Sequence, residues 1–173
     1  EMCIRDSHDS DGCQDNSSED LDDDNDGRAD LSDDCPTGNL NWISNSSTDY
    51  DSDGCQDSNE DTDDDNDSIA DSSDQCFTGD LNWISNSSTD HDSDGCQDST
   101  SEDLDDDNDG MNDLSDSCPI GDLNWILNSN TDYDNDGCQD SNEDTDDDND
   151  SIMDSSDLCS NGELDWTSNS TND

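Results

Sequence analysis

The sequence contains a spaced pattern of acidic residues with a turn residue inside it. The segment from Asp49 to Glu60 reads D-Y-D-S-D-G-C-Q-D-S-N-E, with carboxylates at positions 1, 3, 5, 9 and 12 and glycine at position 6. Carboxylates at these spacings, with the backbone carbonyl of position 7, are the ligands with which a 12-residue loop surrounds Ca²⁺. The segment is therefore predicted to be a calcium-binding loop.

The pattern recurs eight times in register, in two alternating forms that we call the GCQD loops and the Asp-rich loops. Each GCQD loop contains Gly-Cys-Gln-Asp, and each Asp-rich loop ends two residues before a cysteine. The predicted ligands of the GCQD loops are Asp9, Asp11, Asp15, Asp49, Asp51, Asp53, Asp57, Glu60, Asp90, Asp92, Asp94, Asp98, Glu102, Asp132, Asp134, Asp136, Asp140 and Glu143. The predicted ligands of the Asp-rich loops are Asp22, Asp24, Asp26, Asp30, Asp33, Asp63, Asp65, Asp67, Asp71, Asp74, Asp105, Asp107, Asp109, Asp113, Asp116, Asp146, Asp148, Asp150, Asp154 and Asp157.

Two GCQD loops are followed by a one-residue insertion. It places Ser18 or Ser101 at position 12, so Glu19 or Glu102 is expected to supply the last ligand instead. The first GCQD loop begins at Ser7 and is predicted to be a truncated site. Because eight loops are present, we expect at least about eight calcium ions, and two per loop where spare carboxylates such as Asp23 and Asp64 bridge neighbouring ions.

Four further substitutions fall inside the loops. Ser68 and Ser151 replace glycine at position 6 of two Asp-rich loops. A left-handed backbone costs a non-glycine residue about 1 kcal/mol, so these two sites are predicted to be weaker. His8 and His91 stand at position 2, which points away from the metal, so neither a ligand role nor a catalytic role is expected for them.

The composition limits the kinds of partner. The 173 residues include 55 acidic and two basic ones, for a formal charge of -53, and only 22% are hydrophobic. Such a chain buries too little apolar surface to offset its backbone entropy, so a disordered acidic tail is one interpretation. The regular spacing of the acidic residues favours a second interpretation, a chain folded around divalent ions. Nucleic acid and membrane insertion are not expected, because cations and long apolar segments are lacking.

The nine cysteines include two regular series. They are Cys13, Cys55, Cys96 and Cys138, and Cys35, Cys76, Cys118 and Cys159, which together repeat every 83 residues. Regular cysteines are typical of a disulfide framework in an oxidising environment, so an extracellular or cell-surface location is predicted. Structural zinc is the alternative, but no C-x₂₋₄-C pair is present.

The cysteine spacing divides the chain into four repeats, 7–48, 49–89, 90–131 and 132–173, the last expected to be truncated within a longer array. No segment shows helical periodicity, and the main apolar cluster per repeat is Leu-x-Trp-Ile, with threonine in place of isoleucine in the fourth repeat. We therefore expect irregular backbone in an extended, solenoid-like array of calcium loops. Residues 1–6 do not fit the repeat. They match the translation of a DNA-library adapter, which we interpret as an artefact of a metagenomic sequence.

The segment from Asp22 to Pro36 reads D-x-D-x-D-G-x-x-D-x-x-D-x-C-P, and the next cysteine, Cys55, follows 20 residues after the first. In these motifs nearly the whole array resembles thrombospondin type 3 repeats. The resemblance implies a calcium-wrapped, disulfide-linked, extracellular chain without regular secondary structure. The sequence departs from that family in the Leu-x-Trp-Ile connector and in Phe77 and Ser160, which replace proline.

The resemblance also implies a disulfide pairing. The implied pairs are Cys35–Cys55, Cys76–Cys96 and Cys118–Cys138, with Cys13 and Cys159 bonded to further repeats. Each such loop contributes roughly 3 kcal/mol in the chain-entropy model. A competing register that begins with Cys13–Cys35 leaves none of the eight unpaired and stays open at this point.

Covalent glycans are predicted in the connectors. Sequons recur at one place in three repeats, at Asn45, Asn86 and Asn169, whereas those at Asn16, Asn66 and Asn149 carry less weight. The equivalent Asn128 has lost its acceptor.

The repeats favour a structural role, as a calcium-stabilised and glycosylated segment of an extracellular fibre or stalk. Its expected partners are calcium ions, covalent glycans, and copies of itself or further repeats. One alternative is an adhesin or matrix module whose tryptophans bind sugar, although packing explains one tryptophan per repeat equally simply; another is an acidic calcium buffer. No nucleophile, base or open metal constellation predicts an enzyme.

Overall fold

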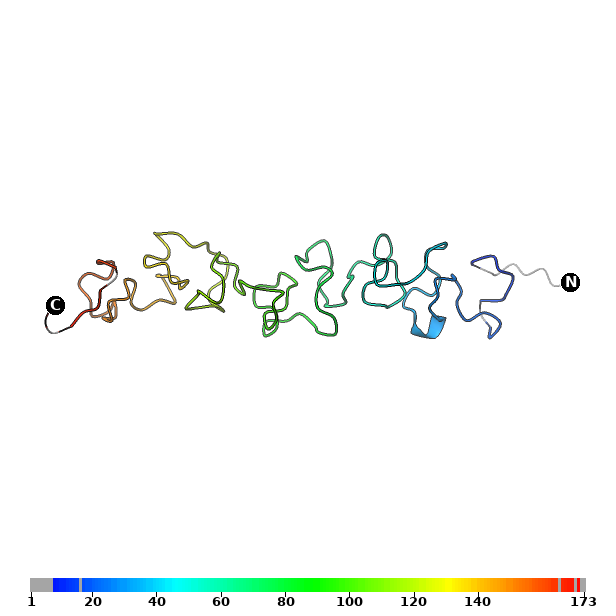
Figure 1. Ribbon diagram of the computed structural model, residues 1–173, viewed down its shortest axis with the longest axis horizontal. Coiled ribbons are helices and arrows are strands. Elements are labelled where there is room, and N and C mark those ends of the chain that lie inside the picture. Colours follow the sequence, from blue (N-terminus) through cyan, green and yellow to red (C-terminus); the bar gives the residue numbers. More distant parts are fainter. Residues whose placement is uncertain (1–7, 16, 165, 170, 172–173) are drawn as a thin grey trace. The chain divides into compact units, whose positions relative to one another are not determined.

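The computed structural model describes residues 8–15, 17–164, 166–169 and 171. Within this part of the chain, the regular secondary structure is one 3-10 turn, η1 (Asp30–Ser32), and the rest is turns, bends and irregular backbone (Figure 1). The prediction of an irregular fold is confirmed. No described helix has the length and apolar character needed to cross a membrane. The segment 1–6, Ser7 and the sequon at Asn16 lie outside the described residues.

The chain divides into two units. One comprises Glu1–Ser85 with Asp94–Cys96, and the other comprises Asn86–Ser93 with Gln97–Asp173. Each unit holds loops of both forms, so the local geometry can be compared within each.

The buried residues are mostly aspartates. Among the described residues, the buried apolar side chains are Cys55, Cys96, Trp125 and Cys138. Every described side chain less than 2% exposed is an aspartate; these are Asp24, Asp26, Asp49, Asp65, Asp67, Asp90, Asp107, Asp109 and Asp132. A hydrophobic core ordinarily supplies the main favourable term in folding, and here carboxylates occupy its place.

The loops close on themselves through their own carboxylates. In all eight loops, the aspartate at position 5 accepts a hydrogen bond from the backbone N–H of position 7, as Asp53 does from Cys55 at 2.7 Å. The aspartate at position 9 accepts one from the N–H of position 2, as Asp57 does from Tyr50 at 3.0 Å. In each loop, aspartate side chains therefore bind backbone N–H groups that a helix or strand would need for its own hydrogen bonds. The loops form a series of turns instead.

Each loop also has left-handed backbone at two positions. Position 4 is always asparagine or serine with a positive φ, from 53° at Asn149 to 68° at Ser10. Position 6 is left-handed as well, including Ser68 at 84° and Ser151 at 80°. Both serines therefore have the strained left-handed backbone on which the prediction of weaker calcium sites depends. The requirement at position 4 was not predicted, although asparagine tolerates this conformation better than most residues.

Three disulfides join consecutive loops, Cys35–Cys55, Cys76–Cys96 and Cys118–Cys138. These are the pairs implied by the thrombospondin resemblance. The competing register is not found among the described cysteines, because Cys13 and Cys159 carry free thiols.

The side chain at position 2 of each GCQD loop fixes the connector of its own repeat. Tyr50 donates to the carbonyl of Gly79 at 2.8 Å, and Tyr133 donates to that of Gly162 at 2.7 Å. The Nε2 atom of His91 lies 2.9 Å from the carbonyl oxygen of Gly121. His8 makes the equivalent contact. Histidine and tyrosine therefore serve the same structural contact at this position.

Candidate metal centres

The aspartates at positions 1, 3 and 5 lie close together in one loop of each form. Asp22, Asp24 and Asp26 each offer an oxygen within 4.8 Å of the others in an Asp-rich loop. The aspartates at positions 1, 3 and 5 of the Asp49 loop form the same group in a GCQD loop. Calcium–oxygen distances are about 2.3–2.6 Å, so the oxygen–oxygen separations in these groups are those expected around a single ion.

Orphaned oxygen atoms test whether a cation fits these loops. Several carboxylate oxygens are buried without a hydrogen-bond partner: Asp22 Oδ1, Asp26 Oδ2, Asp63 Oδ1, Asp105 Oδ1, Asp109 Oδ2, Asp134 Oδ1 and Asp146 Oδ1. A buried, unpaired carboxylate oxygen is strongly unfavourable unless a cation or a donor satisfies it. Hard oxygen donors with no nitrogen or sulfur among them suit Ca²⁺ or Mg²⁺, and the flexible geometry of Ca²⁺ suits irregular loops best.

A second kind of centre lies where a GCQD loop meets the following Asp-rich loop. Asp15, Asp20 and Asp23 offer one oxygen each within 4.8 Å of one another. Asp15 is at position 9 of the GCQD loop. Asp20 lies two residues before the Asp-rich loop begins, and Asp23 is at position 2 of that loop. We call this arrangement a junction centre. Asp20 is 7% exposed and Asp23 is 8% exposed, and each has a buried oxygen without a hydrogen-bond partner.

The junction centre recurs in the next repeat as Asp57, Asp61 and Asp64. Burial, followed by the nearby charges of Asp71, Asp57 and Asp61, raises the pKa of Asp64 to about 7. The negative charges gathered here oppose one another, and a divalent cation would relieve both the repulsion and the unpaired oxygens.

The second unit repeats this electrostatic environment. Burial and the charges of Asp113, Asp98 and Asp103 raise the pKa of Asp106 to about 7. In the last repeat, burial and the neighbouring Asp154 raise the pKa of Asp147 to about 6. The corresponding residues are thus close enough to perturb one another in all the copies.

Sequence reasoning missed the central member of each junction centre. These residues are Asp20, Asp61, Asp103 and Asp144, and they fall outside the 12-residue loop template. The available signal was their constant offset, two residues before every Asp-rich loop. Asp23 and Asp64, at position 2, were expected only as spare carboxylates for neighbouring ions.

The glutamates at position 12 have other partners in the structure. Glu60 Oε1 accepts the backbone N–H of Asn39 at 2.7 Å, in the connector of the preceding repeat. Glu143 Oε1 accepts that of Asp122 at 2.8 Å, and its Oε2 accepts that of Gln139 at 3.2 Å. These contacts give both glutamates a structural role that the loop template did not predict.

The third GCQD loop is divided between the two units. Of its three predicted ligands at positions 1, 3 and 5, Asp90 and Asp92 belong to one unit and Asp94 belongs to the other. Position 9 of this loop, Asp98, lies in the same unit as Asp90 and accepts the N–H of His91 at 3.2 Å.

The asparagines predicted to carry glycans stabilise a turn in the connector. Asn45 is exposed, and its Nδ2 donates to the carbonyl of Ile43 at 2.7 Å and to Thr48 Oγ1 at 2.8 Å. Asn128, which lacks the acceptor of a sequon, makes the equivalent bonds to Ile126 and Thr131. The turn therefore explains why asparagine recurs here whether or not a glycan is attached.

The tryptophans line grooves next to the loops. Trp83 lies with Leu81 and Ile84 beside Asp51 and Asn66 in a groove of about 380 Å³. The indole N–H groups of Trp42, Trp83 and Trp125 are buried without a hydrogen-bond partner. Because these indole N–H groups face the interior, packing is the main visible role of the three side chains. Trp42 and Trp83 remain half-buried, whereas Trp125 is buried.

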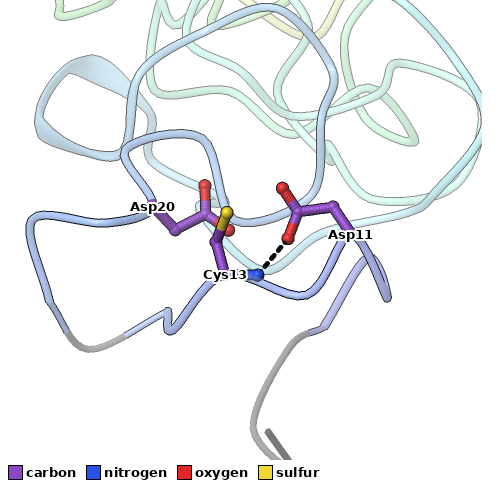
Figure 2. Close-up of side chains that lie close together, drawn as sticks. All are labelled: Asp11, Cys13 and Asp20. Carbon is purple, nitrogen blue, oxygen red and sulfur yellow. Dashed lines mark hydrogen bonds between the residues drawn. The ribbon is translucent and has the colours of Figure 1, made fainter.

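Cys13 lies in an acidic environment. Figure 2 shows its sulfur beside Asp20, with Asp11 accepting the Cys13 backbone N–H at 2.6 Å. A hydrogen bond to Asp11, together with nearby negative charge, raises the pKa of the Cys13 thiol.

No model of a known protein family matches the chain, and no curated protein matches it. The thrombospondin resemblance therefore rests on the motifs of the chain itself.

Proposed function

We propose that this chain is a calcium-stabilised structural segment of an extracellular fibre or stalk, built as an array of loops similar to thrombospondin type 3 repeats. The observation that carries the proposal is the burial of aspartates in the positions that apolar residues fill in other proteins. Such a chain needs cations to become stable, and bound Ca²⁺ then contributes its binding energy to folding. The proposed role is mechanical and not enzymatic.

The two kinds of centre give the proposal a stoichiometry. One ion in each of eight loops and one in each of four junction centres makes about twelve ions per chain. Twelve divalent ions change the formal charge from -53 to about -29 (-53 + 24). The loaded chain remains acidic, which favours solubility and disfavours lateral association.

Extracellular placement is part of the same proposal. Three disulfides are stable in an oxidising environment, where calcium is also plentiful. Glycans at Asn45, Asn86 and Asn169 would extend from exposed connectors. Attachment at each Nδ2 leaves one hydrogen to donate, so a glycosylated connector keeps only part of the turn.

The test is calcium removal from the oxidised chain. We expect native mass spectrometry to count about twelve ions, and we expect EDTA to cause expansion in small-angle scattering and rapid proteolysis, both reversed by Ca²⁺. Thiol alkylation before and after chelation controls for disulfide loss. A chain that stays protease-resistant in EDTA would contradict the proposal, and a loaded chain that stays expanded would indicate a calcium buffer.

A binding module is the second candidate, favoured by the grooves beside the tryptophans. An aromatic ring next to calcium-binding carboxylates suits a sugar, which stacks on the ring and offers hydroxyl ligands. Glycan-array binding that requires Ca²⁺ and is lost in Trp83→Ala would favour this function. Unchanged folding of that variant is the necessary control.

A further inference from the structure

The three disulfides determine which parts of the chain carry tension when its two ends are pulled apart. Each one closes a covalent ring with a sequence separation of 20, the first from Cys35 to Cys55. Tension follows the shortest covalent path, so it crosses the disulfide and bypasses residues 36–54. Residues 77–95 and 119–137 are bypassed in the same way. We call these three stretches the shielded segments.

The backbone between one disulfide and the next has no such bypass. The stretch from Cys55 to Cys76 has a sequence separation of 21 (76 − 55), and the stretch from Cys96 to Cys118 has one of 22 (118 − 96). Both stretches therefore carry the full tension along their backbone. We call them the load-bearing segments.

The two kinds of segment divide the candidate metal centres between them. The load-bearing segment of the second repeat contains a whole junction centre around Asp61 and all five predicted ligands of an Asp-rich loop, within residues 63–74. The shielded segment 36–54 contains the group at positions 1, 3 and 5 of the GCQD loop that begins at Asp49. The same ligand chemistry is therefore on the load path in one loop form and off it in the other.

Contacts within the load-bearing segment join residues that tension would separate. Asp63 Oδ2 accepts the backbone N–H of Ser68 at 3.1 Å, and Asp71 Oδ1 accepts that of Asp64 at 2.8 Å. The backbone N–H of Asp71 donates to the carbonyl of Thr62 at 3.0 Å. The buried Oδ1 of Asp63 has no hydrogen-bond partner, which suits a cation ligand. Carboxylates from both ends of this loop around one cation would add resistance to extension.

The shielded segments carry most of the groups that other molecules could recognise. Two of the three recurrent sequons, at Asn45 and Asn86, lie in these segments, and so do Trp42, Trp83 and Trp125. Tension would reach these groups only through their non-covalent contacts with the rest of the chain, and not along the backbone. The connectors are thus placed where stretching distorts them least.

We propose that the Asp-rich loops and junction centres are the elements through which this chain resists tension, in a calcium-dependent way, and that the disulfides keep three GCQD ligand groups and their connectors off the load path. The inference rests on the proposed role in a fibre or stalk and adds how load is distributed within a repeat. A fully extended residue spans at most about 3.6 Å. Loss of one disulfide would therefore lengthen the load path by about 7 nm, since the sequence separation is 20.

Constant-force extension of single molecules tests the proposal on the full chain, held at its two termini in saturating Ca²⁺ without reductant. A matched pair of variants removes the position 1 carboxylate from the two loop forms, Asp63→Asn on the load path and Asp49→Asn in a shielded segment. Asp63→Asn should accelerate one opening event at least about tenfold, because a charged ligand is lost from the load path. Asp49→Asn should weaken calcium binding in its own loop, measured by native mass spectrometry, without accelerating any opening event. Equal acceleration by both variants, or none by Asp63→Asn, would overturn the proposal.

A variant without the first disulfide, Cys35→Ser with Cys55→Ser, tests the shielding itself. It places residues 36–54 on the load path, so the fully extended length should grow by about 7 nm and Asp49→Asn should now accelerate opening. An effect of Asp49→Asn that is the same with and without the disulfide would contradict the shielding. If this variant does not fold, the comparison of Asp49→Asn with Asp63→Asn in the oxidised chain decides alone. A chain that binds calcium and expands in EDTA, but opens equally fast in those two variants, would reject this inference while leaving the proposed function intact.

Discussion

The GCQD loop at Gly54 and the Asp-rich loop at Gly27 use the same ligand positions but are attached to their surroundings differently. The GCQD loop is covalently fixed through Cys55, and its glycine lies directly against Asp33. In the Asp-rich loop, the region around Gly27 is open. Its attachment comes instead from Asp24, whose Oδ2 accepts the N–H of the connector residue Gly38 at 2.9 Å. Identical ligand spacing therefore does not determine how a loop packs.

The largest difference is expected from alanine at the two glycines. Both positions are left-handed, with φ near 100°, so alanine costs each about 1 kcal/mol of backbone strain. Gly54→Ala also forces a methyl group into Asp33, which adds roughly 1–3 kcal/mol of overpacking. Urea unfolding at saturating Ca²⁺ should show Gly54→Ala to be clearly less stable than Gly27→Ala. Equal destabilisation would mean that the contact relaxes easily.

The next effect concerns the junction between the two loop forms. Asp61→Asn keeps the hydrogen bonds to the N–H groups of Thr62 and Asp63 through its remaining oxygen but removes one carboxylate charge. We expect one fewer bound calcium in native mass spectrometry, or a loss of affinity at one site of at least tenfold. The exposed Asp34→Asn is the control and should leave the stoichiometry unchanged. An unchanged count in both variants would indicate that ions bind only in the loops.

Both loop forms should respond to pH in the same direction. Burial, followed by the charge of Asp53, raises the pKa of Asp51 to about 7, and burial raises that of Asp33 to about 7. A folded-state pKa above the ordinary value stabilises the calcium-free fold at acid pH, and this stabilisation is lost as pH rises through about 7. In EDTA, the chain should therefore become more compact from pH 8 to pH 5. With Ca²⁺ the trend reverses, because protons compete for the ligands. Small-angle scattering along both pH series checks the two signs.

The smallest effect is expected at Ser68, where the Asp-rich loop of the second repeat departs from that of the first. Its φ of 84° is strained for serine, so Ser68→Gly should raise stability by about 1 kcal/mol or less. The same change should tighten calcium binding at that loop, measured by titration calorimetry. A loss of stability would show that the serine side chain makes a favourable contact.

The proximity of the predicted ligands within a loop could be foreseen, because their contacts span few residues. The bonds from position 5 to position 7, and from position 9 to position 2, depend only on local spacing. The junction centres were not predictable from a single-loop template, because Asp61 belongs to neither loop and joins Asp57 and Asp64 only when the two loops meet. The structural roles of Glu60 and Asn128 were also missed. A position-12 ligand explains the glutamate, and a lost sequon explains the asparagine, equally well from the sequence.

The sequence by itself determined the chemistry of this protein: alternating aspartates, regular cysteines and few apolar residues exclude a conventional core and predict folding around cations. The tertiary structure decided which loops touch. It distinguished Gly54, which lies under Asp33, from Gly12, which is exposed, although both occupy position 6 of the same motif. The physical reason is that ligand spacing acts within one loop, whereas burial depends on a neighbouring surface that the motif does not encode.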